Sequence, residues 1–159
     1  DYHALAEAYY QRAGQAAEKT GCQIVGHFDL LTKFNEGGQL FDEAAPRYVD
    51  AAMGALESLL RRDVIFEVNT GAISRGCRSA PYPAPFLLRA IQERGGRICI
   101  TSDSHSPRTL TSAFPLAAEL ALSCGFRETW LLTAEGFQAV PLEAFLAEAR
   151  RAGREGGGT

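Results

Sequence analysis

GGRICITSDSH, at residues 95–105, contains the clearest strand of the sequence. A helix is predicted over residues 85–94, and Gly95-Gly96 would end it. A strand is predicted over residues 97–101, in which residues 98–100 are apolar without alternation, as is typical of a strand buried on both faces. A polar cluster follows at residues 102–105, and then a further helix is predicted over residues 107–123. Helix, buried strand and helix in this order predict a parallel sheet covered by helices.

The same alternation continues in both directions along the chain. We predict further helices over residues 2–20, 46–62 and 142–150, and further strands over residues 22–25, 64–66, 129–132 and 136–140. The stretch at residues 69–83 is rich in Gly, Ser and Pro, and we expect it to be a loop. No linker divides the chain. The predicted fold class is therefore α/β, with one domain over residues 1–150 and a disordered Gly-rich tail over residues 151–159.

Composition excludes several classes of partner. The chain has 159 residues, of which 46% are hydrophobic and 22% are charged, as in an ordinary globular domain. The net charge of −3 argues against nucleic acid, and no apolar run is long enough to cross a membrane. The four cysteines form no CxxC pair, which favours a reduced, cytoplasmic setting. The chain begins inside a predicted helix and without Met, so we take its start as a cut end.

Polar side chains two residues apart follow each of the first three predicted strands. The pairs are His27 with Asp29, Glu67 with Asn69, and Asp103 with His105. Residues i and i+2 of an extended chain face the same way, and parallel strands end at one edge of a sheet. We therefore expect the three pairs to meet at the carboxyl-end rim, where α/β proteins place their active sites.

Imidazoles and carboxylates gathered in one cleft are suited to zinc, iron or manganese, because a cation offsets the like charges. Each pair also has a simpler interpretation. His27 and Asp29 suit a hydrogen-bonded turn, and residues 102–106 suit the N-cap of a helix. His3 is expected on a helix surface. The recurrence of the pattern at three equivalent places favours a metal site over three separate local features.

Four stretches resemble the motifs of one enzyme family. They are GHFDLLTKFNE at residues 26–36, FEVNTG at 66–71, SRG at 74–76 with PYP at 81–83, and SDSH at 102–105. All are similar to signatures of the histidinol-phosphatases of the polymerase-and-histidinol-phosphatase (PHP) superfamily. The last motif recurs across the superfamily, whereas the first and third are narrower. The resemblance covers nearly the whole chain.

The resemblance implies the C-terminal portion of a distorted (β/α)7 TIM-like barrel. It implies hydrolysis of a small phosphate ester, L-histidinol phosphate, to L-histidinol and phosphate in histidine biosynthesis. Its motifs assign the metal ligands to His27, Asp103 and His105, and the last two are also the expected catalytic residues. Arg75 would bind the substrate phosphate, because its guanidinium can donate two parallel hydrogen bonds. The remaining expected binding residues are Glu67, Asn69 and, less directly, Lys33, with Tyr82 as a loop anchor.

The chain also departs from the family pattern, because the opening His-x-His and further His and Glu ligands do not occur in it. We therefore expect the divalent metal cluster (Zn, Mn or Fe) to be incomplete and this polypeptide alone to be inactive. Three alternatives stay open: another PHP phosphoesterase acting on nucleotides or DNA ends, a non-catalytic binding or structural remnant, and an amidohydrolase-type barrel. The oligomeric state is not predicted.

Overall fold

The computed structural model describes residues 1–155 and shows a mixed α/β arrangement. Helices and strands alternate along most of the chain, as the sequence predicts. The elements are α1 (Tyr2–Ala13), α2 (Ala16–Thr20), β1 (Ile24–Val25), η1 (Leu30–Thr32), α3 (Pro46–Leu60), β2 (Ile65–Asn69), α4 (Gly71–Ser74), α5 (Pro85–Glu93), β3 (Arg97–Thr101), η2 (Pro107–Thr109), α6 (Phe114–Ser123), β4 (Glu128–Thr133), β5 (Gly136–Pro141) and α7 (Leu142–Glu155).

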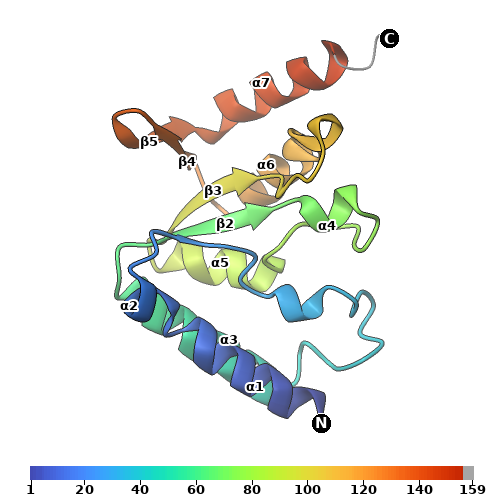
Figure 1. Cartoon of the computed structure of the whole chain (residues 1–159), viewed down its shortest axis with the longest axis vertical. Coiled ribbons are helices and arrows are strands. Elements are labelled where there is room, and N and C mark those ends of the chain that lie inside the picture. The colour runs from blue at the N-terminus through green and yellow to red at the C-terminus, as the bar shows by residue number, and fades with distance from the viewer. Residues whose placement is uncertain (156–159) are drawn as a thin grey trace.

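Strands β1, β2 and β3 form a parallel sheet in that order (Figure 1). Phe66 lies opposite Val25 on one side and Ile98 on the other, and all three side chains are buried. The predicted parallel sheet is thus confirmed for these strands. Parallel pairing brings their carboxyl ends to one edge, which is the right-hand edge of the sheet in Figure 1.

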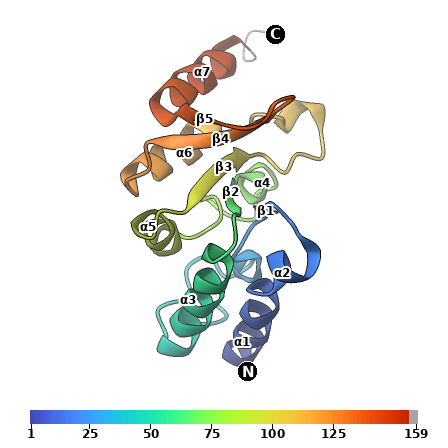
Figure 2. The ribbon, with the colours of Figure 1, turned by 90° about the vertical axis from the view of Figure 1, so that its left-hand side faces the viewer.

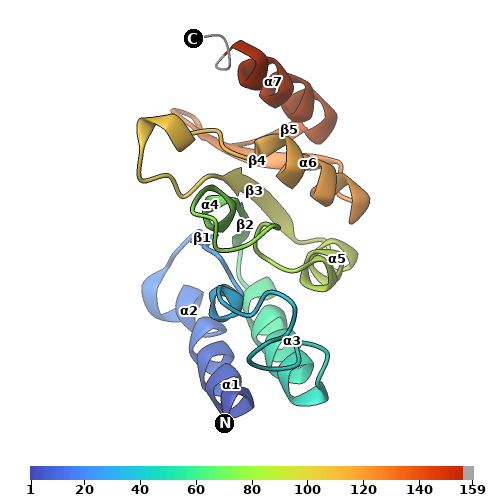
Figure 3. The ribbon, with the colours of Figure 1, turned by 90° about the vertical axis from the view of Figure 1, so that its right-hand side faces the viewer.

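The elements are stacked along the long axis of the molecule roughly in chain order. Helices α1 and α3 pack together at one end, and the β4–β5 hairpin with α7 lies at the other (Figures 1 and 2). Helices α5 and α6 lie on the same side of the sheet (Figure 3). The apolar faces of α3 and α5 and the sheet form one continuous core, whose fully buried members include Leu56, Leu59, Leu87, Leu88 and Ile91.

The fourth predicted strand does not join the parallel sheet. Strand β4 pairs antiparallel with β5, with Trp130 opposite Ala139. Its contact with the sheet is through side chains: the Thr129 hydroxyl donates to the Ile98 carbonyl oxygen at 3.4 Å, and the Arg97 guanidinium lies 4.7 Å from the centroid of the Trp130 ring. A short turn ending in Gly136, whose φ is +99°, allows the chain to reverse directly into a hairpin.

Two predicted helices are shorter than expected. The helix over residues 2–20 is interrupted at Gly14, where the chain packs so closely on α3 that an added Cβ would lie 3.0 Å from the Cα of Ala55. The helix over residues 107–123 begins only at Phe114. Pro115 lacks an N–H group and fits the first turn of a helix but not its interior, so residues 107–109 form a separate 3-10 turn.

The end of the chain differs from the expected boundary at residue 150. Helix α7 continues through residues 151–155, which are part of the predicted tail. The rest of that tail, residues 156–159, lies outside the described residues. No helix in the described part of the chain is both long and apolar enough to cross a membrane.

Candidate active site

The loops that follow β1, β2 and β3 leave the sheet at the same edge and carry the predicted site residues (Figure 1). The first loop contains His27 and η1, the second contains α4 and Arg75, and the third contains Asp103 and His105. The expected placement at the carboxyl-end rim therefore follows directly from the parallel topology.

Glu67, on β2, joins the ends of all three strands. Its Oε2 accepts hydrogen bonds from the backbone N–H of His27 at 2.7 Å and from the Asn69 amide at 2.9 Å. Its Oε1 accepts from the Thr101 hydroxyl, at the end of β3, at 2.6 Å. Both carboxylate oxygens are therefore occupied by protein donors, and the predicted pairing of Glu67 with Asn69 on one face is confirmed. Thr101 is a member that the sequence did not indicate.

Arg75 and Asp103 join the second and third loops through two hydrogen bonds. One nitrogen of the guanidinium, Nη1, donates to the Asp103 carbonyl oxygen at 2.9 Å, and Nη2 donates to its carboxylate Oδ2 at 2.9 Å. Gly71 leaves the space for this pair, because a Cβ there would lie 2.6 Å from Nη2 of Arg75. The pair is about one-third exposed, so the arginine can reach both Asp103 and a ligand in solvent.

His105 lies on the other side of Asp103, with its Nε2 3.7 Å from Oδ1 of Asp103, and its side chain is 75% exposed. Partial burial raises the pKa of Asp103, but the Arg75 guanidinium opposes it, with smaller contributions from Asn69 and His105, and the net pKa lies below its usual range. Asp103 is therefore ionised at neutral pH and is available to bind a cation.

Two of the predicted metal ligands have left-handed backbone conformations. The φ angle is +29° at His27 and +45° at Asp103, and residues other than glycine rarely adopt positive φ angles. Such strain is found mostly at functional sites, where surrounding contacts hold it. His27 is half-buried, and its Nδ1 is buried without a hydrogen-bond partner among the described residues. A buried imidazole nitrogen without a partner is suited to accept a metal ion.

The donor chemistry fits a divalent metal, but the number of converging donors does not complete a site. Asp103 and His105 approach each other closely enough to share an ion, and His27 offers one further nitrogen. Within residues 1–155, however, no group of three or more His, Cys, Asp or Glu side chains is placed to hold a metal ion. Whether His27 joins Asp103 and His105 around one ion stays a prediction.

Asp29 does not share the position of His27, contrary to the expected pairing. Extended geometry ends at Val25, and the reversed backbone at His27 turns Asp29 into the core, where it is fully buried. Its Oδ2 accepts from the Ala84 N–H at 2.8 Å. Burial is the main effect on this carboxyl and raises its pKa to about 6, although Ala84 and Arg78 oppose the shift.

The other expected binding residues differ in their surroundings. The Lys33 ammonium lies 5.2 Å from the centroid of the exposed Phe34 ring. No hydrogen bond within the described residues joins Lys33 to Glu67 or Asp103. Tyr82 is buried and its backbone pairs with Asn69, as expected of a loop anchor. The Arg78 guanidinium lies 5.0 Å from the centroid of the Tyr82 ring. The sequence did not predict this contact, because the SRG motif includes Arg75 but not Arg78.

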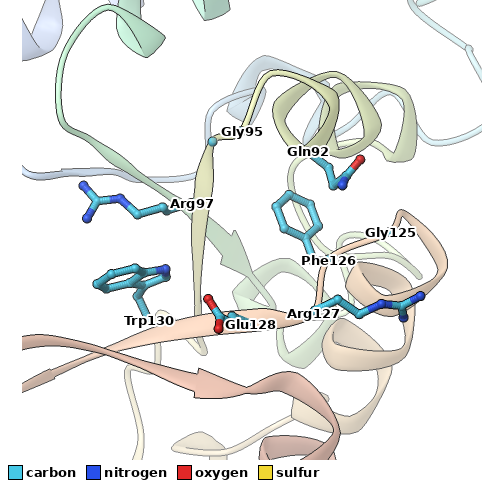
Figure 4. A pocket seen from close by; sticks show the side chains of 9 residues that line it. Gln92, Gly95, Arg97, Gly125, Phe126, Arg127, Glu128 and Trp130 are labelled. Atoms are coloured by element: carbon cyan, nitrogen blue, oxygen red, sulfur yellow. The ribbon is translucent and has the colours of Figure 1, made fainter.

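A separate hollow lies at the opposite end of β3, away from these residues (Figure 4). Its volume is about 300 Å³, and Arg97, Phe126 and Trp130 are among its lining residues. Arg97 already stacks on Trp130 and forms an ion pair with Asp63. None of the predicted site residues contributes to this hollow, so it is not the candidate active site.

Comparison with known proteins finds relatives of one kind. No protein-family model matches the chain. The chain is 26% identical over 125 residues to a protein of Schizosaccharomyces pombe named probable histidinol-phosphatase, an alignment that covers 74% of the chain and 38% of that protein. It is 35% identical over 107 residues to a Deinococcus radiodurans protein of the same name, covering 67% of the chain and 35% of that protein. The chain thus spans only 35–38% of the length of these curated relatives.

Proposed function

We propose that this chain, which is related to the histidinol-phosphatases, forms part of a metal-dependent phosphatase that hydrolyses L-histidinol phosphate to L-histidinol and phosphate. The relationship rests on the two curated relatives. The observation that carries the proposal is the contact of Arg75 with Asp103, beside His105, at the carboxyl ends of parallel strands. In this proposal the three-stranded sheet is a portion of a larger (β/α)7 barrel.

Arg75 would bind the phosphate of the substrate. Its guanidinium is held by Asp103 on one side and is one-third exposed, so part of its donor capacity stays available to phosphate oxygens. The Arg75–Asp103 contact also fixes the direction of the guanidinium before substrate arrives. A donor that is already oriented loses little freedom on binding, which favours both affinity and alignment of the ester.

Asp103, His105 and His27 would hold one or more divalent ions. A bound divalent ion supplies a nucleophilic oxygen at neutral pH and offsets charge on the phosphoryl oxygens. Asp103 would bind as the carboxylate, since its pKa is lowered, and His27 would bind through its unpartnered Nδ1. Because the described residues hold no group of three donors, we propose that ligands from additional polypeptide complete the cluster.

Glu67 and Asn69 would organise the site and not bind the substrate directly. The Glu67 carboxylate already accepts three hydrogen bonds, and Asn69 divides its amide between Glu67 and the Gly71 N–H at 2.9 Å. These contacts hold the ends of β1, β2 and β3 at fixed spacing. The positions of His27, Arg75 and Asp103 depend on that spacing.

The test is an ester panel assayed with the protein translated from the complete reading frame that contains this chain, supplied with Mn²⁺, Zn²⁺ or Fe²⁺. We expect metal-dependent release of phosphate from histidinol phosphate at a higher kcat/KM than from nucleoside monophosphates or terminal DNA phosphates. Asp103→Asn should abolish the activity, whereas Asp50→Asn, an exposed change on α3, should not. Equal or greater activity toward the nucleotides would favour a different phosphoesterase, and no turnover of any ester would favour a non-catalytic module.

The chain of residues 1–159 alone is the second sample in the same assay. We expect no measurable turnover from it, because the described donors do not complete a metal site. Turnover comparable to that of ordinary enzymes, with kcat of roughly 1 per second or more, would contradict this expectation.

A further inference from the structure

Two sequence stretches that the proposed chemistry leaves unexplained are in contact in the structure. The first is the loop after β1, residues 26–36, and the second is the loop of residues 74–84 that carries Arg75. Three separate sets of hydrogen bonds join them, although the partners are separated by 43 to 55 positions along the chain. Only one residue of the second loop, Arg75, is expected to meet the substrate.

Arg78 makes the central contact between the loops. Its Nη1 donates to the Thr32 carbonyl oxygen at 3.1 Å and also contacts the Thr32 hydroxyl. The guanidinium carbon lies over the Tyr82 ring, 5.0 Å from its centroid, and Tyr82 is 1% exposed. Thr32 is itself fully buried, and its hydroxyl donates to the Asp29 carbonyl oxygen at 2.8 Å. Arg78 is therefore attached to the interior of the first loop and is not directed toward a ligand.

Further contacts lie on either side of Arg78. The Glu36 carboxylate accepts from the Ser79 N–H at 2.8 Å and from the Ser79 hydroxyl. Beyond Tyr82, the Ala84 N–H donates to the buried Asp29 carboxylate at 2.8 Å. The Glu36 contact is exposed and contributes little by itself. The two other contacts are buried or half-buried, so they fix the second loop more firmly.

The contacts with the first loop begin at Arg78, three residues after Arg75. On the other side of Arg75, helix α4 is held to β2 through the Asn69 side chain and the Gly71 N–H. The N–H of Arg78 donates to the Ala72 carbonyl oxygen at 3.3 Å, which folds the segment between them into a compact turn. Arg75 therefore lies between two anchors, β2 and Arg78. Loss of either anchor would let its backbone move relative to Asp103.

We infer that Arg78 is a positioning residue, which fixes the Arg75 guanidinium for phosphate by attaching its loop to Thr32. This inference rests on the proposed function, in which Arg75 binds the substrate phosphate. Arg78 itself does not touch the substrate. Its effect on binding should accordingly pass through Arg75 and disappear when Arg75 is removed.

The experiment is a double-mutant cycle in the protein from the complete reading frame, assayed on histidinol phosphate and inhibited by inorganic phosphate. We expect Arg78→Ala to raise both KM and the phosphate inhibition constant roughly tenfold, which corresponds to one oriented charge-assisted contact. Arg78→Lys, which keeps the positive charge but not the planar guanidinium, should give an intermediate rise in both constants. In an Arg75→Ala background, Arg78→Ala should add no further change. Arg89→Ala, an exposed change on α5, is the matched control.

Hydrogen exchange of the same variants measures the attachment without any assay of activity. The backbone amides of Ser79, Ala80 and Tyr82 should exchange at least about tenfold faster in Arg78→Ala than in wild type, and should be unchanged in Arg89→Ala. Unchanged exchange, or an Arg78 effect that persists in full without Arg75, would overturn the inference. A wild-type protein that hydrolyses no phosphate monoester would instead overturn the proposed function on which it rests. If Arg78→Ala does not fold, Arg78→Lys carries the same comparison.

Discussion

Glu67 accepts three hydrogen bonds at the candidate site, and one of the donors is the backbone N–H of the predicted metal ligand His27. Its carboxylate accepts from the His27 N–H, the Asn69 amide and the Thr101 hydroxyl. A carboxylate that receives three donors in a half-buried place is held by charge-assisted hydrogen bonds and stabilises the sheet edge itself. This gives the strand-end glutamate a structural reason to be there in addition to a functional one.

Substitution of Glu67 should therefore lower stability as well as activity. Glu67→Ala removes the acceptor of three donors and leaves the His27 N–H without its partner, so the free energy of unfolding should fall by roughly 2–4 kcal/mol. Urea denaturation followed by circular dichroism measures the change. Glu57→Ala, at an exposed position of α3, should change it by no more than about 0.5 kcal/mol. A fall for Glu67→Ala no larger than that of the control would show that these contacts contribute nothing.

Cys99, in the middle of β3, should be chemically inert in the folded chain. Burial raises the pKa of its thiol to about 12, and the nearby Glu67 carboxylate acts in the same direction. The thiolate is the reactive form, so at pH 8 its fraction is far below that of an ordinary cysteine. Iodoacetamide at pH 8, followed by peptide mass spectrometry, should label the half-exposed Cys77 and leave Cys99 unlabelled until urea is added. Equal labelling rates for the two would contradict the burial of β3.

At the residue scale, the sequence predicted positions better than contacts. The site residues Asp103, His105 and Arg75 were expected near one another and lie near one another, because strand ends in a parallel sheet share an edge. The burial of Asp29 was not foreseen. Its direction depends on a positive φ at His27, which local sequence does not reveal for a residue other than glycine.

At the scale of elements, helices α1 and α3 are joined by a buried pair of tyrosines. The hydroxyl groups of Tyr10 and Tyr48 lie 2.8 Å apart, and both side chains are fully buried. Each hydroxyl is the partner of the other in a place that water does not reach. The cost of removing one should therefore exceed the cost of removing both.

Tyr48→Phe should lower the free energy of unfolding by about 1–3 kcal/mol, because the Tyr10 hydroxyl would stay buried without its partner. Tyr10→Phe combined with Tyr48→Phe should cost less than the sum of the two single changes. Thermal and urea unfolding of the three variants give the coupling energy. Additive single effects would contradict the pairing.

Burial also raises the pKa of the Tyr10 and Tyr48 phenols, so the wild-type chain should lose stability as the pH rises above their ordinary value of 10.

Two glycines give a matched test of the packing between elements. Gly54, inside α3, has no other atom within 4 Å of an added Cβ, so Gly54→Ala should stabilise the chain by roughly 0.5–1 kcal/mol through helix propensity. At Gly96, just before β3, an added Cβ would lie 2.6 Å from Cγ2 of Ile91 and 3.1 Å from its carbonyl oxygen. Gly96→Ala should therefore destabilise by roughly 1–3 kcal/mol. The melting temperatures should move in opposite directions; a shift in the same direction would refute the described packing.

The elements that sequence predicted well are those with a local cause. Strand β3 has the predicted bounds, and α3 and α5 begin at Pro46 and Pro85, the first residues of their predicted ranges. The hairpin of β4 and β5 was predicted as two strands but not as a pair outside the parallel sheet. Which strands pair depends on contacts between segments that are distant in the sequence. Neither β4 nor β5 carries a residue pattern that specifies its partner strand.

At the scale of the whole molecule, the chain is an open stack and not a closed structure. Its parallel sheet has β1 at one edge, where Ile24 is 36% exposed, and Leu5 on α1 is 59% exposed. The curated relatives are longer than the part of them that it matches. Both facts agree with the proposal that additional polypeptide completes the metal cluster beside His27, Asp103 and His105.

We expect these three residues to hold one cation cluster, and anomalous X-ray diffraction measures its position directly. Crystals of the protein from the complete reading frame, grown with Zn²⁺ or Mn²⁺ and inorganic phosphate, should show an anomalous peak within roughly 2.0–2.3 Å of an Asp103 oxygen and of a His105 nitrogen. The same cluster should include His27, and Arg75 should contact the phosphate. An ordered phosphate and metal bound elsewhere, with His27 turned away from Asp103 and His105, would contradict the account.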